Sequence, residues 1–117
     1  MPLRQFVVPN SAQSIDALGL EPDAVVGEVA VNRVRWATDH GDLDLTFDVP
    51  GNSIRCSWRR GDTVFLDIFR EGARRLSVSC GRGQAHVVVV FDTAGLRGDL
   101  TIQLMPEIRI NDQLLFV

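Results

Sequence analysis

Hydrophobic and polar side chains alternate through most of residues 42–80, and this is the clearest pattern in the chain. Four segments carry an apolar residue at every second position: Leu43/Leu45/Phe47/Val49, Ile54/Cys56/Trp58, Val64/Leu66/Ile68 and Leu76/Val78/Cys80. A period of two is typical of a β-strand with one buried face and one face open to water or a partner. Glycine-containing turn signals separate the segments. The pattern therefore predicts an antiparallel meander.

The turn positions predict a register for this meander. We expect a turn about Pro50-Gly51 and three-residue loops at 60–62 and 71–73. The resulting pairs are Phe47 with Ile54, Leu45 with Cys56, Leu43 with Trp58, Asp42 with Arg59, Trp58 with Val64, Cys56 with Leu66, Arg55 with Asp67, Ile68 with Leu76, Leu66 with Val78 and Phe69 with Arg75. A slip of one residue would turn every side chain to the other face, so the single apolar face supports this register.

The segments outside the meander add short strands and one helix. Residues 3–8 read as a strand, and 11–18 as a short helix with Asn10 as its N-cap. Residues 25–37 are extended, with a change of apolar phase near Asn32-Arg33 that indicates a bulge or a bend. Val87 to Phe91 is apolar at every position, so both faces of the segment are apolar. This is typical of a strand covered on both faces. Further strands follow at 100–104, 108–110 and 114–117.

These elements predict a mainly β protein that forms a single domain over residues 1–117. We expect an antiparallel meander of eight to ten short strands and one short N-terminal helix. Such a chain can cover its apolar faces as a two-layer sandwich or as a barrel-like closed sheet, and both remain open.

Composition narrows the function classes. The net charge is −3 and the pI is near 5.2, which argues against general nucleic-acid binding. The longest apolar run is too short to cross a membrane, and the first residues lack the apolar core of a secretory signal. All twelve basic residues are arginine, as in GC-rich bacterial genomes. We therefore expect a cytoplasmic bacterial protein.

The two cysteines fit a reducing compartment. Cys56 and Cys80 both point inward in the predicted register, on strands that are two apart and hence about 10 Å from each other. A disulfide needs a Cα separation below about 7 Å. The sequence therefore predicts two buried free thiols.

Several short motifs suggest chemistry, but each has a simpler explanation. Arg-Gly-Asp at 60–62 and 97–99 occupies expected turns, and Asp39-His40-Asp42 lacks a second histidine for a metal site. Cys80 and His86 lack a third orienting residue for nucleophilic catalysis. Arg74-Arg75-Leu76-Ser77 resembles a kinase site but lies in an expected strand. We therefore predict that the protein is not an enzyme and has no cofactor or metal.

The outer face of the meander is the candidate site. The register places Arg55, Phe65, Asp67, Phe69 and Arg75 together there, flanked by Asp42, Asp44 and Arg59. Two outward phenylalanines require either a second layer over them, from 25–37 or the C-terminal strands, or a protein-binding surface. Single-stranded nucleic acid could also stack on the rings, but the interleaved aspartates disfavour it.

We therefore predict a small protein-binding module, with an inhibitor or toxin-neutralising immunity protein as one concrete form. The acidic set Asp39, Asp42, Asp44 and Asp48 would steer association with a basic partner. The alternative is a β-barrel that binds a small molecule in an internal cavity. The partner is expected to be a protein and not nucleic acid or a membrane, and the sequence also allows a homo-oligomer.

Overall fold

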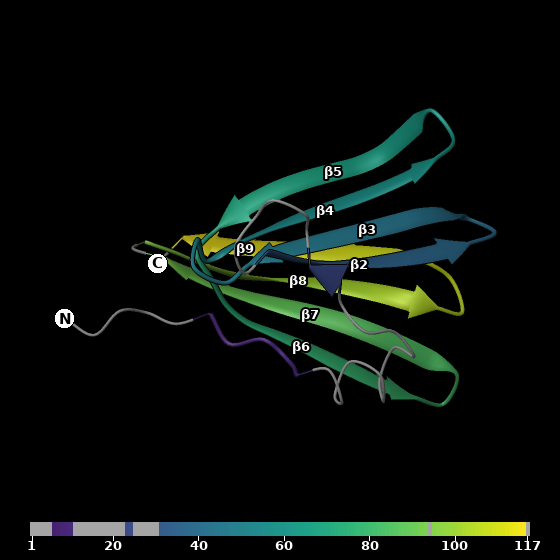
Figure 1. Cartoon of the computed structure of the whole chain (residues 1–117). Coiled ribbons are helices and arrows are strands. Elements are labelled where there is room, and N and C mark those ends of the chain that lie inside the picture. Colours follow the sequence, from purple (N-terminus) through teal and green to yellow (C-terminus); the bar gives the residue numbers. More distant parts are fainter. Residues whose placement is uncertain (1–5, 11–22, 25–30, 94, 117) are drawn as a thin grey trace.

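The computed structural model describes residues 6–10, 23–24, 31–93 and 95–116 (Figure 1). Within them the chain forms nine strands and no helix, so the predicted helix at 11–18 lies outside the described residues. The strands are β1 (Asp23–Ala24), β2 (Val31–Thr38), β3 (Gly41–Asp48), β4 (Ser53–Arg60), β5 (Thr63–Glu71), β6 (Ala73–Gly81), β7 (Gln84–Thr93), β8 (Leu96–Met105) and β9 (Arg109–Phe116).

The strands form two antiparallel sheets that pack face to face (Figure 1). The first sheet has the order β1-β2-β3-β4-β5 and the second the order β6-β7-β8-β9. Each strand is paired with its neighbour in sequence, except where the chain passes from β5 to β6. The mainly β, antiparallel prediction is confirmed, and of its two architectures the sandwich is the observed one.

The first predicted hairpin is confirmed residue by residue. Phe47 lies opposite Ile54, Leu45 opposite Cys56, Leu43 opposite Trp58 and Asp42 opposite Arg59. The alternation of apolar and polar residues on β3 and β4 admits one register, because the adjacent one would bury the charged residues.

The second predicted register is wrong, because the turn is shorter and a bulge follows it. Arg60 pairs with Thr63 around a two-residue turn in which Gly61 has a φ of 56°, a conformation that glycine adopts without strain. The register then shifts between Trp58 and Arg59, and Phe65 is the unpaired extra residue. Trp58 therefore lies opposite Leu66, and Cys56 opposite Ile68.

The third predicted hairpin does not exist. At Gly72, where φ is 86°, the chain leaves the first sheet and begins the second, so β5 and β6 do not pair. The expected pairs Ile68–Leu76, Leu66–Val78 and Phe69–Arg75 are wrong. Leu76 instead lies opposite Val89, and Val78 opposite Val87. The passage allows the second sheet to cover the apolar face of the first, which one extended sheet could not do.

The core lies between the sheets and is built from alternate residues of the inner strands. Its fully buried members include Ile54, Cys56, Val89, Leu100 and Ile102. Phe6 is also in the core. Its neighbour Val7 forms a parallel bridge to Arg75 in β6, which replaces the expected strand over 3–8 in its described part.

Three finer predictions are corrected. Cys56 is buried, and desolvation raises the pKa of its thiol to about 12, but Cys80 is exposed at the end of β6. The two cysteines are not joined by a disulfide. Residues 87–91 are not covered on both faces, because Val90 is exposed. Finally, β2 pairs with β3 from Val31 to Thr38 without a shift of register, so the change of apolar phase produces no bulge in that pairing.

Among the described residues, an ion pair between Arg70 and Asp112 joins the two sheets. The guanidinium of Arg70 in β5 donates two hydrogen bonds of 2.7 Å to the carboxylate of Asp112 in β9. The same guanidinium lies 5.1 Å from the ring centre of Phe91 in β7. The hydrogen bonds from Arg70 lower the pKa of Asp112. This pair, which we call the inter-sheet clasp, fixes the end of β5 against the second sheet.

Candidate functional site

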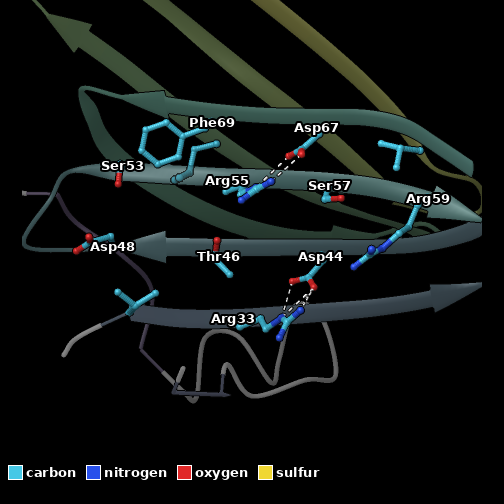
Figure 2. A pocket seen from close by; sticks show the side chains of 13 residues that line it. Arg33, Asp44, Thr46, Asp48, Ser53, Arg55, Ser57, Arg59, Asp67 and Phe69 are labelled. Carbon is cyan, nitrogen blue, oxygen red and sulfur yellow. Dashed lines mark hydrogen bonds and ion pairs between the residues drawn. The ribbon is translucent and has the colours of Figure 1, made fainter. Parts of the chain in front are cut away.

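The candidate site is the outer face of the first sheet, on the side away from the second sheet. Side chains at alternate positions of β2 to β5 point outward and enclose a shallow hollow of about 530 Å³ (Figure 2). Its charged lining residues are Arg33, Asp44, Asp48, Arg55, Arg59 and Asp67. Its other lining residues are Val31, Thr46, Ser53, Ile54, Ser57, Val64 and Phe69.

The hollow follows from the sizes of neighbouring side chains. Thr46 and Ser57, on the two central strands, carry short side chains (Figure 2). Longer side chains surround them, including Arg33 on β2 and Phe69 on β5. A flat sheet surface therefore becomes a basin with a hydroxyl-lined floor and a charged and aromatic rim.

Arg33 and Asp44 form the first ion pair of this face. The Nε of Arg33 donates to both carboxylate oxygens of Asp44, at 2.8 and 2.9 Å, and its terminal nitrogen also contacts the carboxylate. Arg35 lies 3.8 Å from the same carboxylate. The hydrogen bond to Asp44 raises the pKa of Arg33. Side chains two residues apart on β2 thus share one acidic group on β3.

Arg55 and Asp67 form the second ion pair. The Nε of Arg55 donates to Oδ1 of Asp67 at 3.0 Å, and its terminal nitrogen to Oδ2 at 2.8 Å. The two residues were expected to lie directly opposite each other, but Arg55 lies opposite Phe69 and Asp67 opposite Ser57. The contact is therefore diagonal, and the long side chain of arginine spans the shift.

Arg59 differs from the other two arginines of the hollow. Arg59 belongs to none of the ion pairs found among the described residues. The hydrogen bond from Arg55 lowers the pKa of Asp67, and the charges of Arg55 and Arg59 add to that effect. The guanidinium of Arg59 therefore remains open to a further carboxylate.

The apolar part of the site is exposed. Phe69 is 66% exposed and Val64 is 57% exposed, both on the rim of the hollow. The layers expected over them lie elsewhere: the described part of 25–37 is a strand of the same sheet, and the C-terminal strands belong to the second sheet. The interpretation in which a second layer covers this face is therefore wrong.

Phe65 is placed differently from the expectation. Because Phe65 is the extra residue of the bulge, Val64 takes its place in the lining of the hollow. The ring of Phe65 packs instead on Trp58, with 5.0 Å between the ring centres, and remains 50% exposed. The two expected phenylalanines are therefore both exposed, but only Phe69 lines the hollow.

The other expected site residues divide into two groups. Asp44, Arg55, Arg59, Asp67 and Phe69 come together around the hollow. Asp42 is exposed on the same face, opposite Arg59, but outside the lining. Arg75 lies in β6 of the second sheet, because residues 71–73 change sheets, and so cannot join this face.

Sequence reasoning missed several members of the site. The alternation along β3 and β4 already indicated three of them, Thr46, Ser53 and Ser57. They occupy the same outward-facing alternate positions as the predicted site residues Asp44 and Arg55. Arg33 required the pairing of β2 with β3, which brings it beside Asp44. Val64 required the bulge, for which the sequence holds no clear signal.

The alternative chemistry gains no geometric support. In β6 and β7, Cys80 lies opposite Ala85, while His86 lies opposite Ser79. Among the described residues, no three histidine, cysteine or acidic side chains are placed to hold a metal ion. Nor does the described part of the chain contain a helix long and apolar enough to cross a membrane.

A solved structure has the same fold. It is described as a contact-dependent growth inhibition toxin–immunity protein complex from Klebsiella pneumoniae 342. The match has a TM-score of 0.81 at 16% sequence identity and covers 97% of this chain and 100% of the other. No protein-family model and no curated protein sequence matches this chain. The likeness extends over the whole sandwich and, at this identity, establishes the fold.

Proposed function

We propose that this protein is an immunity-type protein that binds a partner toxin or enzyme and neutralises it. The observation that carries the proposal is the likeness, over 97% of the chain, to a chain from a toxin–immunity protein complex. Of the two roles in such a complex, inhibition by binding fits this chain better than toxicity. Its functional groups form an open face of ion pairs, and its thiols and histidines do not converge.

We infer that the outer face of the first sheet is the surface that contacts the toxin. This face combines an exposed aromatic ring, a hollow and fixed charges of both signs, as protein-binding surfaces do. Arg33 and Arg55 are already oriented by Asp44 and Asp67, so a partner meets charges whose positions are set in advance. Preorganised groups lose less conformational entropy on binding.

The charge balance of the face supports a role in selectivity. Three arginines and three aspartates line the hollow, so the face has little net attraction for a partner of either sign. The face would distinguish one partner from another by the arrangement of charges on the partner's surface, because like charges placed opposite each other are costly. We also propose the cytoplasm as its compartment, in keeping with two cysteines that are not joined by a disulfide.

The test begins with a tagged form of the protein used as bait in a native lysate of its own cells. The proposal expects one stoichiometric partner that arrests growth when it is expressed alone in a bacterial host, and growth that returns when this chain is co-expressed. A captured partner that is harmless when expressed alone would contradict the immunity role.

A matched pair of variants then locates the surface. Phe69→Asp alters the proposed face, whereas Leu115→Asp alters β9 of the second sheet at a leucine that is equally exposed, at 69%. We expect Phe69→Asp to lose protection from the toxin and Leu115→Asp to retain it. Equal loss in both variants, or loss in Leu115→Asp alone, would place the contact elsewhere.

A further inference from the structure

The long edge strands of the sandwich are not equally protected. β5 is an edge of the first sheet, and β6 and β9 are the edges of the second. An edge strand presents unpaired backbone N–H and C=O groups, which attract a further strand unless something covers or repels it. The three edges therefore show where another chain could extend the protein.

Two of these edges carry protection. Beside β6, the N–H of Val7 donates to the carbonyl of Arg74 at 2.9 Å, and the carbonyl of Val7 accepts from Leu76 at 2.8 Å. In β9, Leu115 near the end of the strand is exposed, but the central residues are the polar Asn111, Asp112 and Gln113, and the inter-sheet clasp engages Asp112. A covered edge and a polar edge both resist pairing with another strand.

The β5 edge has neither protection. It spans nine residues without a proline, its one irregularity is the bulge at Phe65, and the described residues place no strand beside it. Val64, Phe65 and Phe69 are each at least half exposed along it. Asp67 is the one charged residue between Val64 and Phe69, and Arg55 already pairs with it. This edge combines open hydrogen-bonding groups with apolar side chains, as strand-accepting edges do.

We propose that the protein partner extends the first sheet by adding a strand to β5, with a carboxylate opposite Val64 that pairs with Arg59. This inference rests on the proposed function for its claim that the partner is the toxin. It adds the mode of binding and the charge of the contacting residue, neither of which the likeness of fold supplies.

The position of the carboxylate follows from the register. Arg59 lies opposite Val64, and a residue of an added strand opposite Val64 would lie two strands from Arg59, about 10 Å away between backbones. Valine has a short side chain, and an arginine and a glutamate together are long enough to span that distance. The other two arginines of the hollow already have carboxylate partners, which leaves Arg59 to receive a new one.

A second copy of this chain fits the edge less well. Antiparallel pairing of two β5 strands about their midpoint places Asp67 opposite Asp67, and directly opposed like charges destabilise a sheet. Both copies also carry a net charge of −3. Charge therefore favours a foreign strand with its own acidic residue nearer to Arg59.

The experiment uses two short synthetic peptides with blocked ends and alternating threonine and valine. They differ only in a central glutamate or lysine. Titration into the isotopically labelled full chain, followed by NMR, should shift β5 and Arg59 signals. We expect the glutamate peptide to bind about three- to fivefold more tightly than the lysine peptide, as for a partly exposed ion pair. Arg59→Glu should reverse the preference.

Two variants serve as matched controls for the edge. Val64→Glu supplies the carboxylate from within the chain and should abolish the glutamate preference. Leu115→Glu adds the same charge at an exposed position of β9 and should leave the preference intact. Signal shifts centred on β9, equal binding of the two peptides, or no binding would each overturn the proposal.

Sedimentation and the toxin assay separate the remaining outcomes. A concentration-dependent dimer of the free protein that Val64→Glu dissociates would assign the edge to a second copy and overturn the partner strand. If the peptides behave as expected but no toxic partner is captured, the proposal of strand addition to β5 is supported and the proposed function fails. If a toxic partner is captured and binds Val64→Glu with unchanged affinity, the proposed function stands and the edge proposal fails.

Discussion

The two sheets of the sandwich use their faces differently. In the second sheet, inward residues of β7 and β8 such as Val89, Leu100 and Ile102 are fully buried. In the first sheet, burial is complete on β3 and on the first half of β4, but Leu66 and Ile68 of β5 are only partly buried. The first sheet instead carries the ordered ion pairs and the hollow on its outer face.

This difference separates stability from recognition. The second sheet, β3 and the first half of β4 supply most of the buried apolar surface. Burial of this surface is the main favourable contribution to folding. The hairpin of β4 and β5 retains exposed apolar side chains that folding alone does not require. Substitutions should therefore have graded effects, large in the second sheet and small on the outer face of the first.

The largest effect is expected from Leu100→Ala in β8. Removing a fully buried leucine leaves a cavity and should lower the free energy of unfolding by about 3–5 kcal/mol. The matched change Leu66→Ala, at a partly buried leucine of β5, should cost less than half as much. Urea unfolding of both variants measures the comparison, and equal losses would show that β5 belongs to the same core as β8.

The next largest effect is expected at the passage between the sheets. Gly72→Ala introduces a Cβ at a φ of 86°, and that atom would collide with Cγ2 of Thr93. We expect a loss of about 1–3 kcal/mol in unfolding free energy. Gly61→Ala is the control, because its φ is also positive but no atom lies near the added carbon. A smaller loss in Gly72→Ala than in Gly61→Ala would exclude the collision as the cause.

The inter-sheet clasp should have a smaller effect that depends on pH. Asp112→Asn removes the carboxylate that Arg70 binds, and we expect a loss of about 0.5–1 kcal/mol at neutral pH because solvent screens the pair. The pKa of Asp112 is lowered in the folded protein, so its contribution is present above its unfolded value, about 3.9. The contribution is lost as pH falls through the folded pKa.

Urea unfolding of the native protein and Asp112→Asn at neutral and strongly acidic pH measures this dependence. The difference between the two proteins should vanish at the acidic end, because the native carboxyl is then protonated. A difference that is constant with pH would show that packing against Phe91, rather than charge, accounts for the clasp.

The smallest effect on stability is expected at the outer face. Phe69→Ala should change the unfolding free energy by less than about 0.5 kcal/mol, because the ring is mostly exposed. Leu115→Ala provides the comparison on the second sheet. If Phe69→Ala alone is strongly destabilising, the ring has a structural role and the division between stability and recognition fails there.

Local pattern predicted the parts of the fold that depend on neighbouring residues in sequence. The β3–β4 pairing followed from alternation and a Pro-Gly turn, and the outward set Asp44, Arg55 and Asp67 followed from parity. The β5–β6 passage could not be predicted in this way. A glycine between two alternating segments suits a tight hairpin and a change of sheet equally well, and the choice depends on which faces become covered.

The rest of the site depended on contacts between distant residues. The position of Phe65 was mispredicted because a bulge adds one residue to β5, which moves the neighbouring side chains to the opposite face of the sheet. Nothing in the local sequence pattern indicates this bulge. The exposure of Phe69 depended on where the C-terminal strands pack, which the alternation of β5 does not specify. Arg33 joined the face through a pairing that the expected bulge obscured.

The parallel bridge of Val7 beside β6 also bears on how the protein would assemble if its N-terminal segment were removed. With that bridge in place, part of the β6 edge is covered, while the apolar β5 edge stays open to a partner strand. Without it, each molecule would offer strand-accepting edges on both sheets, and contacts between unlike edges can repeat without closure. We therefore expect the short N-terminal contact to protect the second sheet against edge-to-edge aggregation.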